Sequence, residues 1–235
     1  MSDFVDIAAR VMSASEKRLE HVATNVSNAS TPGFKRQGAF QISPPATNAI
    51  DAVAGLRLRT DFSAGGLKAT GNVFDLAIDG EGFFSVQGEG ENLLTRSGQF
   101  QRTPEGRLVT LQGLALQDSG GGDLIVASAS PEILADGTVL EDGLPTGRVA
   151  LVGVDDISAL IIRAGGMFAL PPGTEAIPDT QASVRQGMLE GSNVAMPAEM
   201  LEMMEAVRQA ETGARLVQLY DTLMGRAIST FGQRS

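Results

Sequence analysis

The chain of 235 residues carries 18 Lys and Arg against 28 Asp and Glu, a formal net charge of −10 that excludes the basic surface typical of nucleic-acid binding. It contains one histidine, His21, and no cysteine or tryptophan, which excludes disulfides, thiolate nucleophiles and zinc or multi-histidine metal sites. We therefore expect no cofactor, no metal, no small-molecule substrate and no nucleic-acid partner.

The N-terminal residues do not have the pattern of a secretion signal. Asp3 and Asp6 stand where a signal peptide carries positive charge, and no apolar stretch of seven or more precedes Lys17. Apolar runs elsewhere are far shorter than the roughly 20 residues that cross a bilayer. We expect neither a cleaved signal peptide nor insertion into a membrane.

The first predicted element is an amphipathic helix within residues 1–34. Its apolar side chains recur at alternating spacings of three and four, which places them on one stripe of a helix. Pro32 and Gly33 disfavour a helical continuation, so the helix should end before residue 32. The stripe that we expect to form an interface consists of Val5, Ala8, Met12, Leu19, Val22 and Val26.

The middle of the chain is predicted to be rich in β-strands. Residues 35–68 show no sustained period and are expected to form an extended connector. Residues 69–185 contain short apolar runs bounded by turn dipeptides such as Asp79-Gly80, Asp136-Gly137 and Asp142-Gly143. No helical pattern separates these runs, which disfavours a parallel α/β fold. We predict an α+β fold in which terminal helices pair like a coiled coil and a Gly-rich, mainly antiparallel β domain lies between them.

The last predicted element, within residues 186–235, is a helix from about 196 to 230. Its apolar residues alternate by four and three over about five heptads, the spacing of a coiled coil. Such a helix would be about 50 Å long, too long to be covered by a body whose radius of gyration is about 13–14 Å. We infer assembly with other chains through Met200, Met203, Val207, Ala214, Val217, Met224 and Ile228.

Catalytic motifs are absent from the sequence. It contains no phosphate-binding glycine loop, no Gly-x-Ser-x-Gly and no His-Glu-x-x-His. We expect His21 to be a surface or interface residue. Strand alternation and a Gly-flanked turn explain Asp75, Asp79 and Glu81 more simply than paired catalytic carboxylates or a calcium loop do. The protein is predicted not to be an enzyme.

Three stretches of the sequence resemble the flagellar basal-body rod and hook family. They are residues 23–35 (ATNVSNASTPGFK), 70–84 (TGNVFDLAIDGEGFF) and 189–194 (LEGSNV). Within that family, the short body and the passages at 147–152 and 167–170 are most similar to the F-type proximal rod proteins. The G-type distal rod proteins are the close alternative.

The resemblance implies a structural subunit whose terminal helices pair and stack into the wall of a tube that transmits torque from motor to hook. The implied partners are other copies of the chain, other rod proteins and the flagellar export apparatus. The implied location is the periplasmic rod of the basal body, reached without a cleaved signal peptide.

The resemblance also implies roles for individual residues. In the family pattern, the end of the first helix and the following turn are formed by Asn25, Asn28, Thr31, Pro32, Gly33 and Phe34. The tail helix is held in register by Asn193 together with Glu199, Arg208 and Glu211. Two positions depart from the pattern: Ala195 replaces a helix-capping Asn, and Ala210 replaces an aromatic residue.

Two readings other than a proximal rod subunit remain open on the sequence alone. One is a distal rod protein of the same family. The other is a soluble coiled-coil adaptor with a β ligand-binding head, which would form a closed oligomer of fixed size instead of an open stack.

Overall fold

The computed structural model describes residues 2–41, 56–88, 90–174, 176–179 and 181–232. It divides into two compact units, which are described separately. The helical unit comprises Met1–Ser27, Gln37–Thr60 and Val194–Ser235, and the β unit comprises Asn28–Arg36 and Asp61–Asn193. These divisions differ from the predicted boundaries, because part of the expected connector forms strands that belong with the helices.

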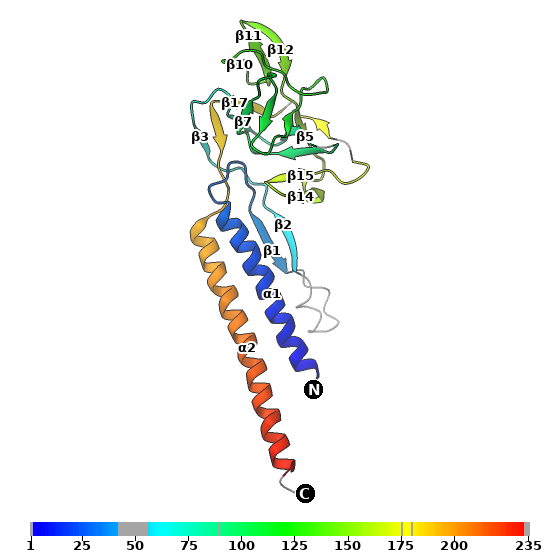
Figure 1. Ribbon diagram of the computed structural model, residues 1–235, viewed down its shortest axis with the longest axis vertical. Coiled ribbons are helices and arrows are strands. Elements are labelled where there is room, and N and C mark those ends of the chain that lie inside the picture. The colour runs from blue at the N-terminus through cyan, green and yellow to red at the C-terminus, as the bar shows by residue number, and fades with distance from the viewer. Residues whose placement is uncertain (1, 42–55, 89, 175, 180, 233–235) are drawn as a thin grey trace. The chain divides into compact units, whose positions relative to one another are not determined.

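The helical unit is built on two long helices, α1 (Ser2–Ser27) and α2 (Met196–Gly232). They lie side by side and antiparallel (Figure 1). α1 ends before residue 32, as predicted. At the start of α2, the carbonyl of Ala195 accepts hydrogen bonds from the N–H groups of Ala198 and Glu199, at 2.9 and 3.1 Å. Over the described residues, neither helix is long and apolar enough to cross a membrane.

Two short strands complete the helical unit. β1 (Gln37–Gln41) and β2 (Leu56–Thr60) pair in antiparallel fashion, with Gln37 opposite Thr60. This strand pair occupies part of the segment that we expected to be an extended connector. An isolated two-stranded sheet is marginal in water, so the contact of β1 with α1 contributes to its order.

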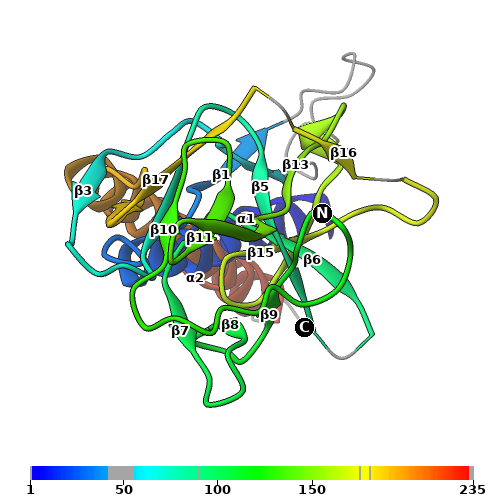
Figure 2. The ribbon, with the colours of Figure 1, turned by 90° about the horizontal axis from the view of Figure 1, so that it is seen from above.

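The β unit contains the remaining strands (Figure 2), and every pairing between its named strands is antiparallel. This agrees with the predicted α+β class. In chain order they are β3 (Leu67–Ala69), β4 (Leu76–Asp79), β5 (Phe83–Gln87), β6 (Asn92–Thr95), β7 (Phe100–Arg102), β8 (Leu108–Thr110), β9 (Ala115–Leu116), β10 (Glu132–Ile133), β11 (Thr138–Glu141), β12 (Leu144–Arg148), β13 (Leu151–Gly153), β14 (Ile161–Arg163), β15 (Met167–Ala169), β16 (Ile177–Pro178), β17 (Ser183–Gln186) and β18 (Met188–Glu190), with a 3-10 helix, η2 (Ile157–Ala159), before β14.

The largest sheet runs in the order β14-β15-β6-β5-β9-β8-β7, and β13 and β16 attach to it through β5. A second sheet is formed by β10, β11 and β12, while β17 pairs with β4 and β18 pairs with β3. The β11–β12 hairpin turns at Asp142-Gly143, where both residues have positive φ (51° and 79°). Asp-Gly is the preferred pair for such a turn, and this was one of the predicted turn dipeptides.

The core of the β unit lies on both sides of β5, because successive strand residues face opposite ways. Phe84 meets Phe100 edge to face, with ring centroids 5.4 Å apart, in the main cluster. On the other side Phe83 packs with Phe62 and Phe168 in a smaller cluster, with centroids 5.1–5.8 Å apart. The few aromatic residues of the chain thus fix the centre of this unit.

Candidate assembly interface and buried polar cluster

The face of α2 that contacts α1 is a row of small or polar residues. Glu199, Ala206 and Gly213 recur every seven residues along α2 and are buried. A Cβ atom at Gly213 would lie 2.7 Å from Cγ of Met12. The missing side chain therefore lets the two helices approach closely at this point.

The predicted stripe of α2 is only partly covered by α1. Met203, Val217 and Met224, together with Ala214, are half-buried. Met200 and Val207 are 55% and 41% exposed. The seam against α1 includes the residues one position before these two, so Met200 and Val207 lie beside the seam instead of in it. Their assignment to an assembly interface stays a prediction.

The exposed apolar surface of α2 is larger than the predicted stripe. In the N-terminal half, Met200, Met204 and Val207 lie on one face, about a quarter to nearly half of a turn from Glu199 and Ala206 at about 100° per residue. In the C-terminal half, Leu219 and Leu223 are more than half exposed. Apolar surface of this extent on a helix typically marks a site of protein–protein contact.

The predicted stripe of α1 is largely turned towards α2. Ala8 and Val22 are buried, and Met12, Leu19 and Val26 are half-buried. The side chains of Val5 and Ile228, which belong to the predicted interface, lie outside the described part of the structure. His21 is half-buried on the same helix.

Asn25 is the polar centre of the helical unit. Its buried amide donates to Oε2 of Glu199 at 3.0 Å and to the carbonyl of Gln37 at 2.8 Å. Its Oδ1 accepts from the N–H of Gln37 at 2.9 Å. One side chain therefore joins α1, α2 and β1. Of the other residues assigned to register, Arg208 and Glu211 are exposed, and Glu211 pairs loosely with Arg215 at 3.9 Å.

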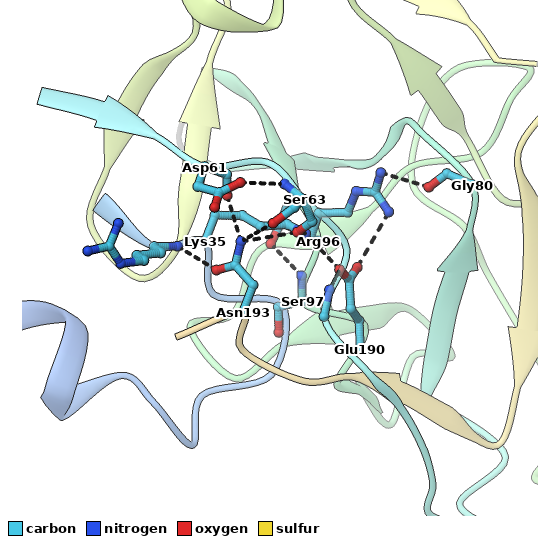
Figure 3. Close-up of polar contacts among 11 residues, drawn as sticks. Lys35, Asp61, Ser63, Gly80, Arg96, Ser97, Glu190 and Asn193 are labelled. Carbon is cyan, nitrogen blue, oxygen red and sulfur yellow. Dashed lines mark hydrogen bonds and ion pairs between the residues drawn. The ribbon is translucent and has the colours of Figure 1, made fainter. Parts of the chain in front are cut away.

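A buried ionic cluster centres on Glu190 in the β unit (Figure 3). Oε1 of Glu190 accepts from Nζ of Lys35 at 2.6 Å and from the N–H of Gly65 at 2.8 Å. Oε2 accepts from Nη1 of Arg96 at 3.4 Å. Lys35 is 2% exposed, Arg96 5% and Glu190 1%, so two cations share one carboxylate out of contact with water.

Each cation of the cluster has further partners. Nζ of Lys35 donates to the carbonyl of Ser63 at 2.8 Å, and Nη2 of Arg96 donates to the carbonyl of Gly80 at 2.9 Å. The guanidinium also lies over the ring of Phe83, 5.4 Å from its centroid. Burial lowers the pKa of Lys35 and of Arg96, and the charge and hydrogen bond of Glu190 act in the opposite direction.

Asn193 lies beside this cluster and bonds to backbone groups of the β unit (Figure 3). Its Oδ1 accepts from the N–H of Arg36 at 2.7 Å. Its Nδ2 donates to the carbonyls of Asp61 and Ser63, at 2.8 and 3.1 Å. Asn193 was predicted to act on the register of the tail helix, and the bonds that it makes here are within the β unit.

The turn after α1 requires its glycine. Gly33 has φ = +70°, and a Cβ there would lie 2.3 Å from the backbone carbon of Arg96. The neighbouring Phe34 is buried and Pro32 is half-buried. Asn28 accepts from Thr31 through both its carbonyl, at 3.0 Å, and its Oδ1, at 3.1 Å. The predicted helix-end residues from 28 to 34 therefore form a compact turn within the β unit.

Of the three carboxylates that were weighed as catalytic candidates, Asp75 and Asp79 have structural partners and Glu81 is exposed. Asp75 is buried and accepts from Nδ2 of Asn72 at 3.0 Å. Asp79 pairs with Arg185 at 2.9 Å on the surface. Among the residues that the structure describes, no three His, Asp or Glu side chains come together to hold a metal ion.

Sequence reasoning missed the ionic cluster. Lys35 and Glu190 occur inside two of the quoted sequence stretches, but no role was assigned to them. They are 155 residues apart, and Arg96 is 94 residues from Glu190. Local periodicity carries no signal for such a contact, and the kind of signal that could have found it is co-variation of the three positions among relatives.

Comparison with protein-family models finds two matches. Residues 77–144 match the model described as flagellar hook protein FlgE/F/G D1 domain. Residues 185–230 match the model described as flagellar basal body rod FlgEFG protein C-terminal. The second match includes Glu190, Asn193 and most of α2.

Comparison with curated proteins finds relatives along nearly the whole chain. The flagellar basal-body rod protein FlgF of Caulobacter vibrioides is 33% identical over 227 residues, covering 92% of this chain and 93% of the relative. FlgF of Escherichia coli is 34% identical, covering 87% and 88%. The flagellar basal-body rod protein FlgG of Agrobacterium fabrum is 28% identical, covering 92% and 95%.

Proposed function

This chain belongs to the family of flagellar basal-body rod proteins, and we propose that it builds the proximal part of the rod by joining neighbouring subunits through α1 and α2. Proteins of this family are structural subunits located in the flagellar basal body, where they assemble with other rod proteins. Under this proposal the chain reaches the periplasm through the flagellar export apparatus, pairs its helices as a coiled coil, and transmits torque.

The observation that carries this proposal is the apolar face of α2 that α1 leaves uncovered. Met200, Met204 and Val207 follow one another along the helix, and each has at least two fifths of its surface exposed. Burying a side chain of this kind contributes about 1.5–3 kcal/mol. Because these three side chains are about half exposed, a neighbouring helix laid on this face would gain roughly 2–4 kcal/mol from them together, a contribution to association that is lost when the face is charged.

The test introduces a charge on that face. The double variant Met200→Asp/Val207→Asp is expected to fold as a monomer, because both side chains are already exposed, but to give no rod and no swimming in cells that lack the natural gene. The matched control is Thr212→Asp, which adds negative charge at an exposed polar position of α2. Normal swimming of the double variant would refute assembly through this face.

The lengths of the alignments favour the F-type assignment over the G-type. The FlgF relative of Mesorhizobium japonicum aligns over all of this chain and all of its own length. Alignments with FlgG relatives extend over 255–258 positions, against 242 for this FlgF relative, so they require more gap positions against the 235 residues of this chain.

Complementation tests that assignment directly. We expect the gene for this chain to restore swimming to a strain lacking FlgF, because the subunit would then meet its own neighbours in the rod. We expect no rescue of a strain lacking FlgG. Rescue of only the second strain would make the chain a distal subunit. A closed oligomer of fixed size in light scattering, with no rescue of either strain, would favour the adaptor reading.

A further inference from the structure

Three of the places where the chain enters or leaves the β unit meet at one point. Arg36, Asp61 and Asn193 are each the terminal residue of a β-unit segment. The N–H of Asp61 donates to the carbonyl of Arg36 at 2.8 Å. The side chain of Asn193 bonds to the N–H of Arg36 and to the carbonyl of Asp61. Figure 3 shows the Asn193 amide between these segments.

We propose that the side chain of Asn193 is a joint that fastens these three chain ends of the β unit to one another. A carboxamide is suited to this role because one group supplies both an acceptor and two donors. Its Oδ1 holds the segment that ends at Arg36, and its Nδ2 holds the segment that begins at Asp61. A force that the chain carries into the β unit is then distributed over three chain segments instead of acting on one.

The joint differs from the neighbouring ionic cluster in its accessibility to water. Asn193 is half-buried, whereas Lys35, Arg96 and Glu190 are buried. Water can therefore replace the Asn193 amide when that amide is removed, and the damage should stay local. Removing a charge from the ionic cluster leaves the remaining charges unpaired in the interior, and this should destabilise the whole unit.

The experiment measures amide hydrogen exchange of the purified full chain. In Asn193→Ala the N–H of Arg36 loses its acceptor, and we expect its exchange to be about tenfold faster. The N–H of Asp61 should also exchange faster. In Asn193→Asp the acceptor remains while the donors are lost, so exchange at Arg36 should stay within about threefold of the wild type. The matched control is Asn92→Ala, at an exposed position of β6, which should change neither amide.

A second readout uses trypsin, which cleaves after arginine, because Arg36 belongs to the joint and Arg59 lies two residues before Asp61. We expect faster cleavage after Arg36 in Asn193→Ala, cleavage close to that of the wild type in Asn193→Asp, and unchanged cleavage in the control. Unchanged exchange at Arg36 in Asn193→Ala would overturn the proposal. So would an equal acceleration of the core amides of β5, because Asn193 would then only stabilise the unit as a whole.

The proposal rests on the proposed rod function only for its mechanical meaning. Exchange and proteolysis are measured on the unassembled chain, so their outcome does not depend on rod formation. A chain that fails to restore swimming but shows the expected exchange pattern would refute the rod assignment and leave the joint in place. The opposite result would refute the joint alone.

Discussion

Glu190→Gln should destabilise the β unit strongly, because it removes the negative charge that two buried cations share. The substitution keeps the length and nearly the volume of the side chain. The new amide offers one acceptor oxygen, but its NH2 group faces a site where Lys35, Gly65 and Arg96 all donate. At least one donor then loses its acceptor, and both cations lose their counter-charge.

The expected magnitude follows from the burial of the cluster. Removing one partner of a buried ion pair costs about 3–5 kcal/mol, since it leaves an uncompensated charge in the interior. For a unit of this size that corresponds to a fall in melting temperature of about 6–20 °C. The double variant Lys35→Met/Glu190→Gln removes one stranded cation as well and should recover at least about 1 kcal/mol of this loss.

Calorimetry and circular dichroism are the appropriate assays. The chain has no tryptophan, and its one tyrosine, Tyr220, lies in α2, so intrinsic fluorescence does not follow the β unit. Glu132→Gln is the matched control, because it makes the same chemical change at an exposed position of β10. A melting temperature for Glu190→Gln within about 3 °C of the control would refute the argument, since it corresponds to only about 1 kcal/mol.

Two further predictions concern the surroundings of this cluster. In urea unfolding, Gly33→Ala should lower the free energy of unfolding clearly more than Gly113→Ala does. Both glycines have positive φ, a strain of about 1–2 kcal/mol for alanine, but only Gly33 has the backbone of Arg96 in the path of the new methyl group. Equal losses of free energy in the two variants would contradict this explanation. Hydrogen bonds from Ser63 hold the pKa of Asp61 below its usual 3.8, so the stability that this carboxylate contributes is present above about pH 4 and is lost as the pH falls through the lowered pKa. Asp61→Asn should therefore flatten the dependence of the free energy of unfolding on pH in that acidic range. An unchanged slope would show that folding does not lower the pKa of Asp61.

The two helices could be predicted from sequence because their signal is local. A 3-4 alternation of apolar residues is a property of neighbouring positions, and Pro32 marks the end of α1 within a few residues. Which neighbour each face of α2 meets is not a local property. Ala206 and Gly213 are too small to stand out in an apolar pattern, yet both are buried, and Gly213 leaves room for Met12 of α1.

The buried cluster and the unit boundaries could not be predicted because they depend on contacts between distant segments. Lys35 and Glu190 read as surface charges in a single sequence, since charged residues are almost never fully buried unless they are paired. The weak pattern of residues 35–68 likewise hid β1 and β2, whose pairing joins strands on either side of a long intervening segment. Only the fold brings such partners together.

The contact between Asn25 and Gln37 has a consequence for the edge of β1. A side-chain amide carries the same N–H and C=O groups as a peptide bond, and Asn25 presents both to the backbone of Gln37. At this residue α1 therefore takes the place of an additional strand, and this one position of the β1 edge is closed to a foreign chain. An aspartate of the same shape could not donate to that carbonyl, so the amide of Asn25 is what closes this position of β1 to pairing with another chain.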